Sequence, residues 1–473
     1  GFFASLFFLY TFLFSPAVVA RWAGVDYKIV HLVLVAGFIS IGLLIYFTNL
    51  LERIPSYLLL PDSILFVAVL IYFIVHNTID FPAHFQAVSV VVHDETDPMN
   101  TISMVLLLLL SPIVVLNIAK FAAVLRVEQP RRLALPLFIA GLFFALLVFM
   151  LIFTNVWGYV GEVSRIFRNR FYLPFLIAGL AMILSTFFVR SEQRQKKSVS
   201  APLVVVVFAG IMALVQIVMF AGKATVSSDD QEQLTVMTYN IQQGVDFQGV
   251  KNFAQQCELI ERVNPDVLFL QESDPARISG GGSDVVRYFE QKLNYFCYYG
   301  PKTVTGTFGT AILSRFPLKE CKAIFTYSDV DEIGTAFAQI DIAGKSVMIS
   351  SSHPAGGAQA KIAHARALVN EAKGTGFVIA GGDFNFKQNS SYYKLMTGTL
   401  VDSWLAVWPD GIGDMSAHGI HRGKILDRPS SGVWQDENNL DMKTRIDHIF
   451  VSPNFEVLES VYLPVPDSQT DHP

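Results

Sequence analysis

Residues 376–385 read GFVIAGGDFN, an apolar run followed by two polar side chains. The run predicts a buried β-strand over residues 376–381, and Asp383 and Asn385 follow where that strand ends. Residues i and i+2 of an extended chain point the same way, so both side chains can reach one phosphate group and the water that attacks it. A lone Asp at a strand end is usually a cap or a turn, so this motif has to be weighed with its neighbours.

Five further short polar motifs lie at the ends of apolar runs in the second half of the chain. In chain order they read TYN (238–240), LQES (270–273), SSHP (351–354), RIDHIFVS (445–452) and TDHP (470–473). With GGDFN they supply one Glu, three Asp, two Asn and two His of interest. This set suits a hard divalent cation and a histidine pair acting on a phosphate ester.

Glu272 is the predicted principal ligand of that cation, because it follows a buried strand. Asn240 lies beside it at the end of the first strand, and Asp471 is a second candidate ligand or a carboxylate that orients the base. A phosphodiester is negatively charged and gains charge during attack. A cation held by few carboxylates offsets this charge and keeps positions open for substrate.

The histidines are the predicted acid–base groups. Asp447 precedes an apolar strand, and we expect it to hold His472 in the tautomer that accepts a proton from water. His353 follows the apolar run at 347–350 and can donate a hydrogen bond to the phosphate oxygens. The predicted catalytic set is therefore His353, Asp383, Asn385, Asp447 and His472.

The pattern around these motifs predicts two packed mixed sheets with outer helices. Strands are expected at 234–240, 266–270, 309–314, 336–343, 345–351, 376–381, 445–452 and 455–463, and helices at 248–263, 283–293 and 358–372. Strands and helices interleave, but the hairpin through Ala343 and Gly344 argues against a purely doubly wound sheet.

The first half of the chain consists mainly of long apolar segments. The hydrophobic fraction of 52% and the mean hydropathy of +0.43 are too high for a soluble protein of 473 residues. Seven apolar runs are long enough, or nearly so, to cross a bilayer. They lie at about 2–20, 29–51, 57–75, 101–120, 133–157, 171–189 and 202–221. We therefore expect a multi-pass transmembrane domain over 1–222, a linker over 223–233 and a second domain over 234–473.

The distribution of Lys and Arg predicts the orientation in the membrane. The connections at 52–56, 121–132 and 190–201 hold eight Lys or Arg, and those on the other side hold six. The acidic connection at 76–100 has none, and a glycosylation sequon begins at Asn389. Together these features place the second domain on the non-cytosolic side. The chain begins with Gly1 rather than Met, so we expect further helices upstream.

Charge limits the partners of the second domain. Residues 234–473 carry 20 Lys and Arg against 27 Asp and Glu, a net charge of −7. Nucleic-acid grooves are basic, so no nucleic-acid partner is expected. In the first half, Arg165, Arg168 and Arg170 fall on the predicted domain side and can hold a lipid phosphate. Ordinary anchoring at the membrane interface is the simpler alternative for these three residues.

Taken together, the six motifs resemble the endonuclease/exonuclease/phosphatase superfamily, which has the deoxyribonuclease-like fold. The resemblance covers about 234–473 and implies an α/β four-layer sandwich with Mg²⁺-dependent phosphoesterase activity; Mn²⁺ and Ca²⁺ are alternatives. It carries over as site residues Asn240, Glu272, His353, Asp383, Asn385, Asp447, Asp471 and His472. One departure is Ser352-His353-Pro354 in place of Thr-His-Leu. A second is the end at Pro473, beyond which this fold normally continues.

A narrower resemblance involves residues 271–274, 276–277, 298–301 and 307–309 behind a multi-pass region. In this arrangement the chain is similar to membrane proteins that remodel the lipid of GPI anchors to ceramide. The resemblance implies an endoplasmic reticulum membrane protein with a lumenal catalytic domain and an inositol-phosphate-linked lipid as substrate.

Three hypotheses follow from the sequence. The first is a membrane enzyme acting on a phospholipid or GPI phosphodiester. The second is a nuclease or soluble phosphate-ester hydrolase tethered to the membrane, against which the net charge of −7 counts. The third is a non-catalytic membrane scaffold or transporter with a retired domain, against which the full set of metal and histidine residues counts.

Overall fold

The structure is a computed structural model of the 473-residue chain. It describes residues 1–13, 19–20, 25–48, 56–78, 80–82, 87–91, 98–127, 129–154, 160–188, 210–211, 214–215, 231–246, 248–273, 284–299, 309–330, 334–409, 445–462, 470 and 472. Two compact units are present. The first takes Gly1–Ile79 and His93–Ala221, and the second takes Asp80–Val92, Gly222–Lys302 and Gly306–Pro473. The sequence assigns 1–222 to the transmembrane part, whereas described residues 80–82 and 87–91 belong to the second unit.

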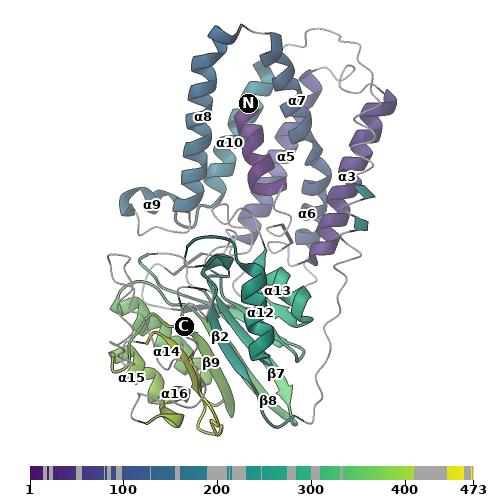
Figure 1. The fold of residues 1–473 in the computed structure, drawn as a ribbon. Coiled ribbons are helices and arrows are strands. Elements are labelled where there is room, and N and C mark those ends of the chain that lie inside the picture. Colours follow the sequence, from purple (N-terminus) through teal and green to yellow (C-terminus); the bar gives the residue numbers. More distant parts are fainter. Residues whose placement is uncertain are drawn as a thin grey trace. The chain divides into compact units, whose positions relative to one another are not determined.

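The first unit is helical (Figure 1). Its longer helices are α3 (Tyr27–Thr48), α5 (Ser56–Asn77), α6 (Pro98–Leu110), α7 (Pro112–Val127), α8 (Pro130–Phe153) and α10 (Tyr172–Phe188), with the short α1 (Phe2–Phe8), η1 (Leu9–Leu13) and α9 (Gly161–Phe167). Among the described residues, three helical stretches are long and apolar enough to cross a membrane. They are Leu59–Asn77, Pro98–Ala122 and Arg131–Phe153. The pair α9 and α10, bent by 73°, would make a fourth span. Most of the predicted run at 202–221 lies outside the described residues.

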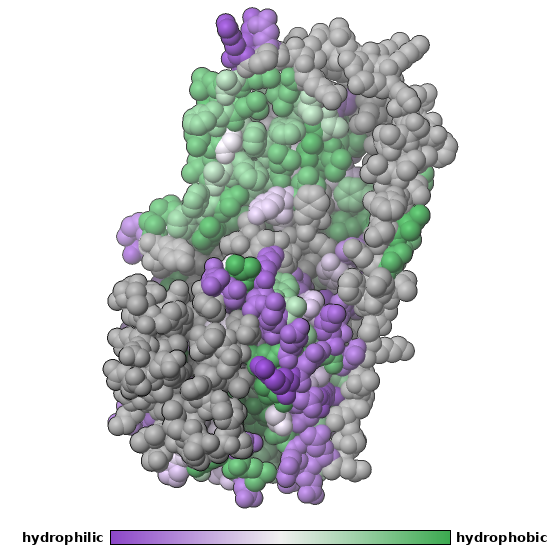
Figure 2. Space-filling view, viewed as in Figure 1, coloured by the Kyte–Doolittle hydropathy of each residue, from purple (hydrophilic) through white to green (hydrophobic). Residues whose placement is uncertain are grey.

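Apolar side chains cover the outside of these helices, and polar ones join them inside. Only 11% of the apolar window in Arg131–Phe153 is buried, and Figure 2 shows apolar residues gathered over the described helices. Inside, the Asn117 amide donates to Ser63 Oγ at 2.8 Å and accepts from the Thr186 hydroxyl at 3.4 Å, which joins α7 to α5 and α10. Buried interhelical hydrogen bonds and a lipophilic outer face are typical of helices packed within a bilayer.

The second unit contains two β-sheets. The seven-stranded sheet has the order β1 (Ala87–Val91), β6 (Lys319–Thr326), β7 (Gly334–Ile342), β8 (Lys345–Ser352), β9 (Phe377–Asp383), β11 (Asp447–Val451) and β10 (Val401–Asp402). The four-stranded sheet has the order β2 (Val236–Asn240), β3 (Val267–Gln271), β5 (Ala311–Ser314) and β4 (Phe296–Tyr298). In each sheet one parallel pair, β2 with β3 or β8 with β9, brings strand ends that carry the polar motifs to a common edge.

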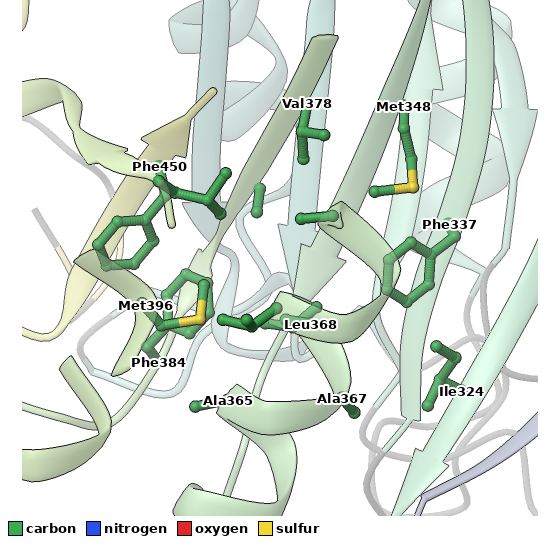
Figure 3. Packing of buried hydrophobic residues seen from close by; sticks show 14 of the residues in the cluster. Ile324, Phe337, Met348, Ala365, Ala367, Leu368, Val378, Phe384, Met396 and Phe450 are labelled. Carbon is green, nitrogen blue, oxygen red and sulfur yellow. The ribbon is translucent and has the colours of Figure 1, made fainter. Parts of the chain in front are cut away.

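The sheets pack face to face between two outer layers of helices. Phe269, Ile312, Ile340, Ile349 and Ile379 belong to the core shared by the two sheets. Helices α12 (Phe253–Val263) and α13 (Val285–Leu293) pack on the four-stranded sheet. The other sheet carries α14 (Ala358–Ala372), α15 (Ser391–Thr397) and α16 (Ser403–Val407), and Figure 3 shows part of the α14 and α15 packing. The predicted four-layer sandwich is thereby confirmed.

One predicted strand is absent from the described residues, and several observed strands were not predicted. The strand predicted over 455–463 is wrong, because described residues 453–462 contain no strand. The side of β11 away from β9 is occupied by β10, so this segment finds no strand edge, and Phe455 and Val457 pack on the core instead. Conversely, β6 was not predicted, because the charged residues of its first half hide the apolar alternation.

The two glycines of GGDFN allow the close approach of backbone and sheet. A Cβ on Gly381 would lie 2.3 Å from the Phe269 ring of the opposite sheet. On Gly382 it would lie 2.0 Å from the main-chain oxygen of Ser352 on the neighbouring strand. A main-chain atom that is hydrogen-bonded in a sheet cannot move away without disrupting the sheet. The contact of Gly382 with Ser352 is therefore more restrictive than that of Gly381 with Phe269.

We therefore expect Gly382→Ala to destabilise the second unit by about 1–3 kcal/mol or more, as overpacking of cores does. The measurement is the midpoint of thermal unfolding of the purified protein in detergent. Gly376→Ala is the matched control, because nothing lies within 4 Å of its added Cβ. Equal midpoints for the two variants would contradict the packing argument.

Candidate active site

Polar side chains from both sheets meet at one edge of the sandwich. Asn240 ends β2 and Asp383 ends β9, while Asp447 begins β11 directly opposite Asp383. Glu272 and His353 follow the last residues of β3 and β8. Antiparallel pairing of β9 with β11 and parallel pairing within each sheet thus bring motifs far apart in sequence to one place.

Asn240 connects the groups of this edge. Its side-chain nitrogen donates to Asp383 Oδ2 at 3.1 Å and lies 3.2 Å from both Glu272 Oε1 and His472 Nε2. Its side-chain oxygen accepts the main-chain N–H of Gln242 at 3.1 Å, which orients the amide. In this orientation Asn240 joins two carboxylates and a histidine, and its role as a metal ligand stays a prediction.

Asp383 is an ionised carboxylate in a buried place. Burial alone would raise its pKa, but the nearby His472, the hydrogen bond and charge of His353, and the N–H of Asn385 together lower the pKa well below its usual value. His353 Nε2 lies 3.4 Å and His472 Nε2 3.6 Å from Asp383 Oδ2. The Asn385 N–H donates to Asp383 Oδ1 at 2.9 Å. The site therefore favours a negative charge at Asp383.

His472 bridges the two aspartates. Its Nδ1 lies 3.0 Å from Asp447 Oδ2, a hydrogen bond that places a proton on Nδ1. Its Nε2 then carries a lone pair, toward which the Asn240 amide points. Burial raises the pKa of Asp447, although His472 opposes the change. A histidine held in this tautomer can accept a proton at Nε2.

Two residues of the site have a backbone conformation that favours glycine. Glu272 has a φ of 47° and Asn385 a φ of 50°. The ammonium group of Lys361 on α14 donates a hydrogen bond to the main-chain oxygen of Asn385. The Gln243 N–H donates to the main-chain oxygen of Glu272 at 3.0 Å. Such conformations cost free energy and persist where surrounding contacts impose them. Lys361 was not singled out from the sequence, because its contact depends on tertiary packing.

A buried ion pair is connected to the main chain of Asp447 through a tyrosine. The guanidinium of Arg445 pairs with Asp402, and the Tyr393 hydroxyl donates to Asp402 at 2.6 Å. Arg445 also donates to the Tyr462 hydroxyl, which donates in turn to the main-chain oxygen of Asp447. The motif RIDHIFVS contains Arg445. Neither Asp402 nor Tyr462 could be found from the motif itself.

The cluster fits a divalent cation. Ligand atoms of Asp383, Asp447 and His472 lie within 4.8 Å of one another and could hold a cation, although the sequence predicts catalytic roles for these three residues. Glu272, the predicted principal ligand, is joined to Asp383 through the Asn240 amide. Carboxylate oxygens are the ligands that Mg²⁺ prefers. Asp471, the remaining candidate ligand, lies outside the described residues.

The three arginines of the predicted headgroup site belong to the first unit. Arg165 forms an exposed ion pair with Glu162 at 3.1 Å on α9. Arg170 donates to the main-chain oxygen of Ile166 at 3.5 Å. Arg168 follows the end of α9. The described catalytic and metal-ligand candidates thus lie in the second unit. The three arginines lie on one short helix and the turn after it, and Asp471 is outside the described residues.

Known proteins match the second half of the chain. Residues 237–472 match the endonuclease/exonuclease/phosphatase family. A truncated TDP2 of Caenorhabditis elegans is 18% identical, with 52% of this chain and 96% of that chain covered and a TM-score of 0.38. TDP2 of D. rerio complexed with single-strand DNA product is 20% identical (47% and 84% covered, TM-score 0.32), and a Bacteroides thetaiotaomicron mannosyl-6-phosphatase is 18% identical (47% and 86%, TM-score 0.33). The match of residues 237–472 to the family model shows that the chain contains a domain of this family, whose members are phosphoester hydrolases that typically use divalent metal ions.

A second buried histidine generates a pH prediction. Burial, helped by the charge of His353, lowers the pKa of His364 to about 3, and its Nδ1 lies 3.2 Å from the Thr326 hydroxyl. An unfolded histidine has a pKa of about 6.5. Between that pH and about 3, His364 is therefore protonated in the unfolded chain but neutral in the folded chain. This contribution to stability is fully present above about pH 6.5 and is lost as the pH falls toward 3.

We expect His364→Gln to weaken the loss of stability on acidification, by at most about 1.4 kcal/mol per pH unit. Thermal unfolding in detergent between pH 7 and 4 measures it. His76→Gln, at an exposed position on α5, is the control and should keep the wild-type pH dependence. The assignment fails if His364→Gln and wild type lose stability in parallel.

The pairing of Asp447 with His472 generates a kinetic prediction. His472→Ala should lower turnover of a soluble phosphodiester by about 100-fold or more, the span of general base catalysis. Asp447→Asn should cost less if Asp447 only orients the ring, and it should shift the pH profile. An unchanged rate and pH profile in Asp447→Asn would show that the pairing has no catalytic part.

Proposed function

We propose that the chain is a membrane-bound, divalent-metal-dependent phosphodiesterase that acts on a phospholipid or on the lipid of a GPI anchor. The observation that carries the proposal is the row Asp447–His472–Asp383, joined to Glu272 by the amide of Asn240. A retired domain would have no need to keep two carboxylates buried beside a histidine, because such burial costs stability.

The residues of the site suit hydrolysis of a phosphate ester. A bound divalent cation, with Glu272 and Asp471 as its proposed ligands, would offset the negative charge of the phosphate. His472 takes a proton from the attacking water at Nε2, and Asp447 holds Nδ1–H and stabilises the imidazolium. His353 donates toward the phosphate oxygens, and Asn385 beside Asp383 orients the phosphate and the water.

A lipid is the proposed substrate class because of the first unit. Three helical stretches there are long and apolar enough to span a bilayer, and the second domain carries a net charge of −7 that suits nucleic acid poorly. Arg165, Arg168 and Arg170 are proposed to hold a headgroup phosphate. The resemblance to GPI-lipid remodelling proteins and the eight-to-six Lys/Arg bias support an endoplasmic reticulum membrane location with a lumenal catalytic domain, and remodelling to ceramide as the process.

One assay tests substrate class and metal together. The purified protein in detergent is incubated with Mg²⁺ or with EDTA, against phospholipids, GPI-type lipids and DNA. We expect turnover of a lipid phosphodiester that EDTA abolishes and that Mg²⁺, Mn²⁺ or Ca²⁺ restores. Turnover of DNA alone would favour a tethered nuclease, and no turnover of any substrate a scaffold.

Glu272→Ala in the same assay should lower turnover by about 100-fold or more, since metal stabilisation of charge contributes several kcal/mol. Folding should be intact, because Glu272 is only half-buried. Glu261→Ala, an exposed carboxylate on α12, is the matched control. Full activity of Glu272→Ala would exclude Glu272 as the principal metal ligand.

A further inference from the structure

One strand of the second unit comes from the middle of the first. Residues Ala87–Val91 form β1, which pairs antiparallel with β6 in five consecutive positions, from Ala87 opposite Thr326 to Val91 opposite Lys322. In sequence this strand lies between α5 and α6, two of the apolar helices. It forms the edge of the seven-stranded sheet, with β6, β7 and β8 between it and the site strand β9.

A buried aromatic residue anchors the same segment. Phe81 is only 5% exposed, and its ring meets that of Phe325 at a centroid distance of 4.8 Å and an interplanar angle of 86°. Phe325 is itself fully buried on β6 and pairs through its backbone with Val88. Edge-to-face contact is a favoured arrangement of two aromatic rings. The segment is thus held by main-chain pairing and by a side chain in the core.

We propose that β1, with Phe81 before it in sequence, is a built-in docking segment that ties the helical unit to the phosphoesterase-type domain independently of the linker at 223–233. The β6 edge is the docking surface, and its occupant is this segment of the same chain. An added antiparallel strand supplies affinity through main-chain hydrogen bonds, and the contact of Phe81 with Phe325 adds a side-chain anchor. In sequence β1 lies between α5 and α6, so we expect the domain to stay bound when the linker is cut.

The docking strand also constrains the membrane topology. Because β1 lies between α5 and α6 in sequence, we expect the chain between these helices to be on the domain's side of a membrane. The segment then shares the protection of the domain against reagents added outside sealed vesicles. This inference does not depend on the chemistry at Asp383 and His472, so it survives if the proposed substrate is wrong.

Cleavage of the linker in the full chain tests the proposal. A specific protease site is inserted after Ser227, the purified protein in detergent is cut, and the products are separated by size-exclusion chromatography. We expect the two fragments of the cut wild-type sequence to co-elute. Release of the C-terminal fragment from that protein would overturn the proposal.

Variants of the segment provide the second arm. Phe81→Ala with Ser89→Pro removes the anchor and one main-chain N–H of β1, and the cut protein should then separate into two fragments. The control is Ser89→Ala with Phe81 unchanged. Alanine keeps the main-chain N–H and the anchor remains, so the fragments should still co-elute. Co-elution of the double variant would show that other contacts hold the domain, and would overturn the role of the strand.

A cross-link keeps the proposal testable if the double variant folds poorly. In a background without Cys321, Val90→Cys with Ala323→Cys places two thiols at positions that face each other in the register. We expect oxidation to join the fragments of the cut protein covalently. Val90→Cys with Ile324→Cys is the control, because neighbouring residues of a strand point to opposite faces. Equal cross-linking of both pairs, or of neither, would contradict the register.

Discussion

The amide of Asn240 is the interaction on which the site depends. Asn240 ends a strand of the four-stranded sheet, yet its nitrogen donates to Asp383 at the end of a strand in the other sheet. A buried polar group without its partner costs about 1–3 kcal/mol, so sheet packing and site geometry must be satisfied together. Below it, the Gln271 amide donates to Ser351 Oγ at 3.1 Å, a second buried bond between the sheets. The core and the site are therefore parts of one structural constraint.

Charge balance explains why so many acids are tolerated at this edge. Histidines on either side keep the pKa of Asp383 low, whereas burial and the charge of Asp383 raise the pKa of Asp447. Neighbouring carboxylates whose pKa values are pushed apart are suited to different tasks. Behind them, the burial of Asp402 would raise its pKa, but His448 and Arg445 lower it below its usual value. Each buried acid thus has a specific positive or donor partner.

The two units differ in which side chains they expose. Helices of the first unit expose many apolar side chains and bury some polar ones, such as Asn117 between Ser63 and Thr186, which is typical of helices in lipid. The second unit buries its apolar side chains between sheets and helices. Hydropathy alone separates these halves near residue 222, but it cannot show that 80–92 leaves the helices to complete a sheet.

The sequence by itself determined the class of the fold and most of the site. Apolar runs, period-two alternation and polar residues at strand ends are local patterns, so β2, β3, β8, β9 and the motifs of GGDFN and TDHP could be predicted. Only the tertiary structure decided the placement of β1 and β6, the loss of the predicted strand at 455–463, and the partners Asp402, Tyr462 and Lys361. These features depend on pairings between distant residues, such as Asn240 with His472 across 232 positions, and a local pattern carries no information about which distant partner fills a strand edge or satisfies a buried charge.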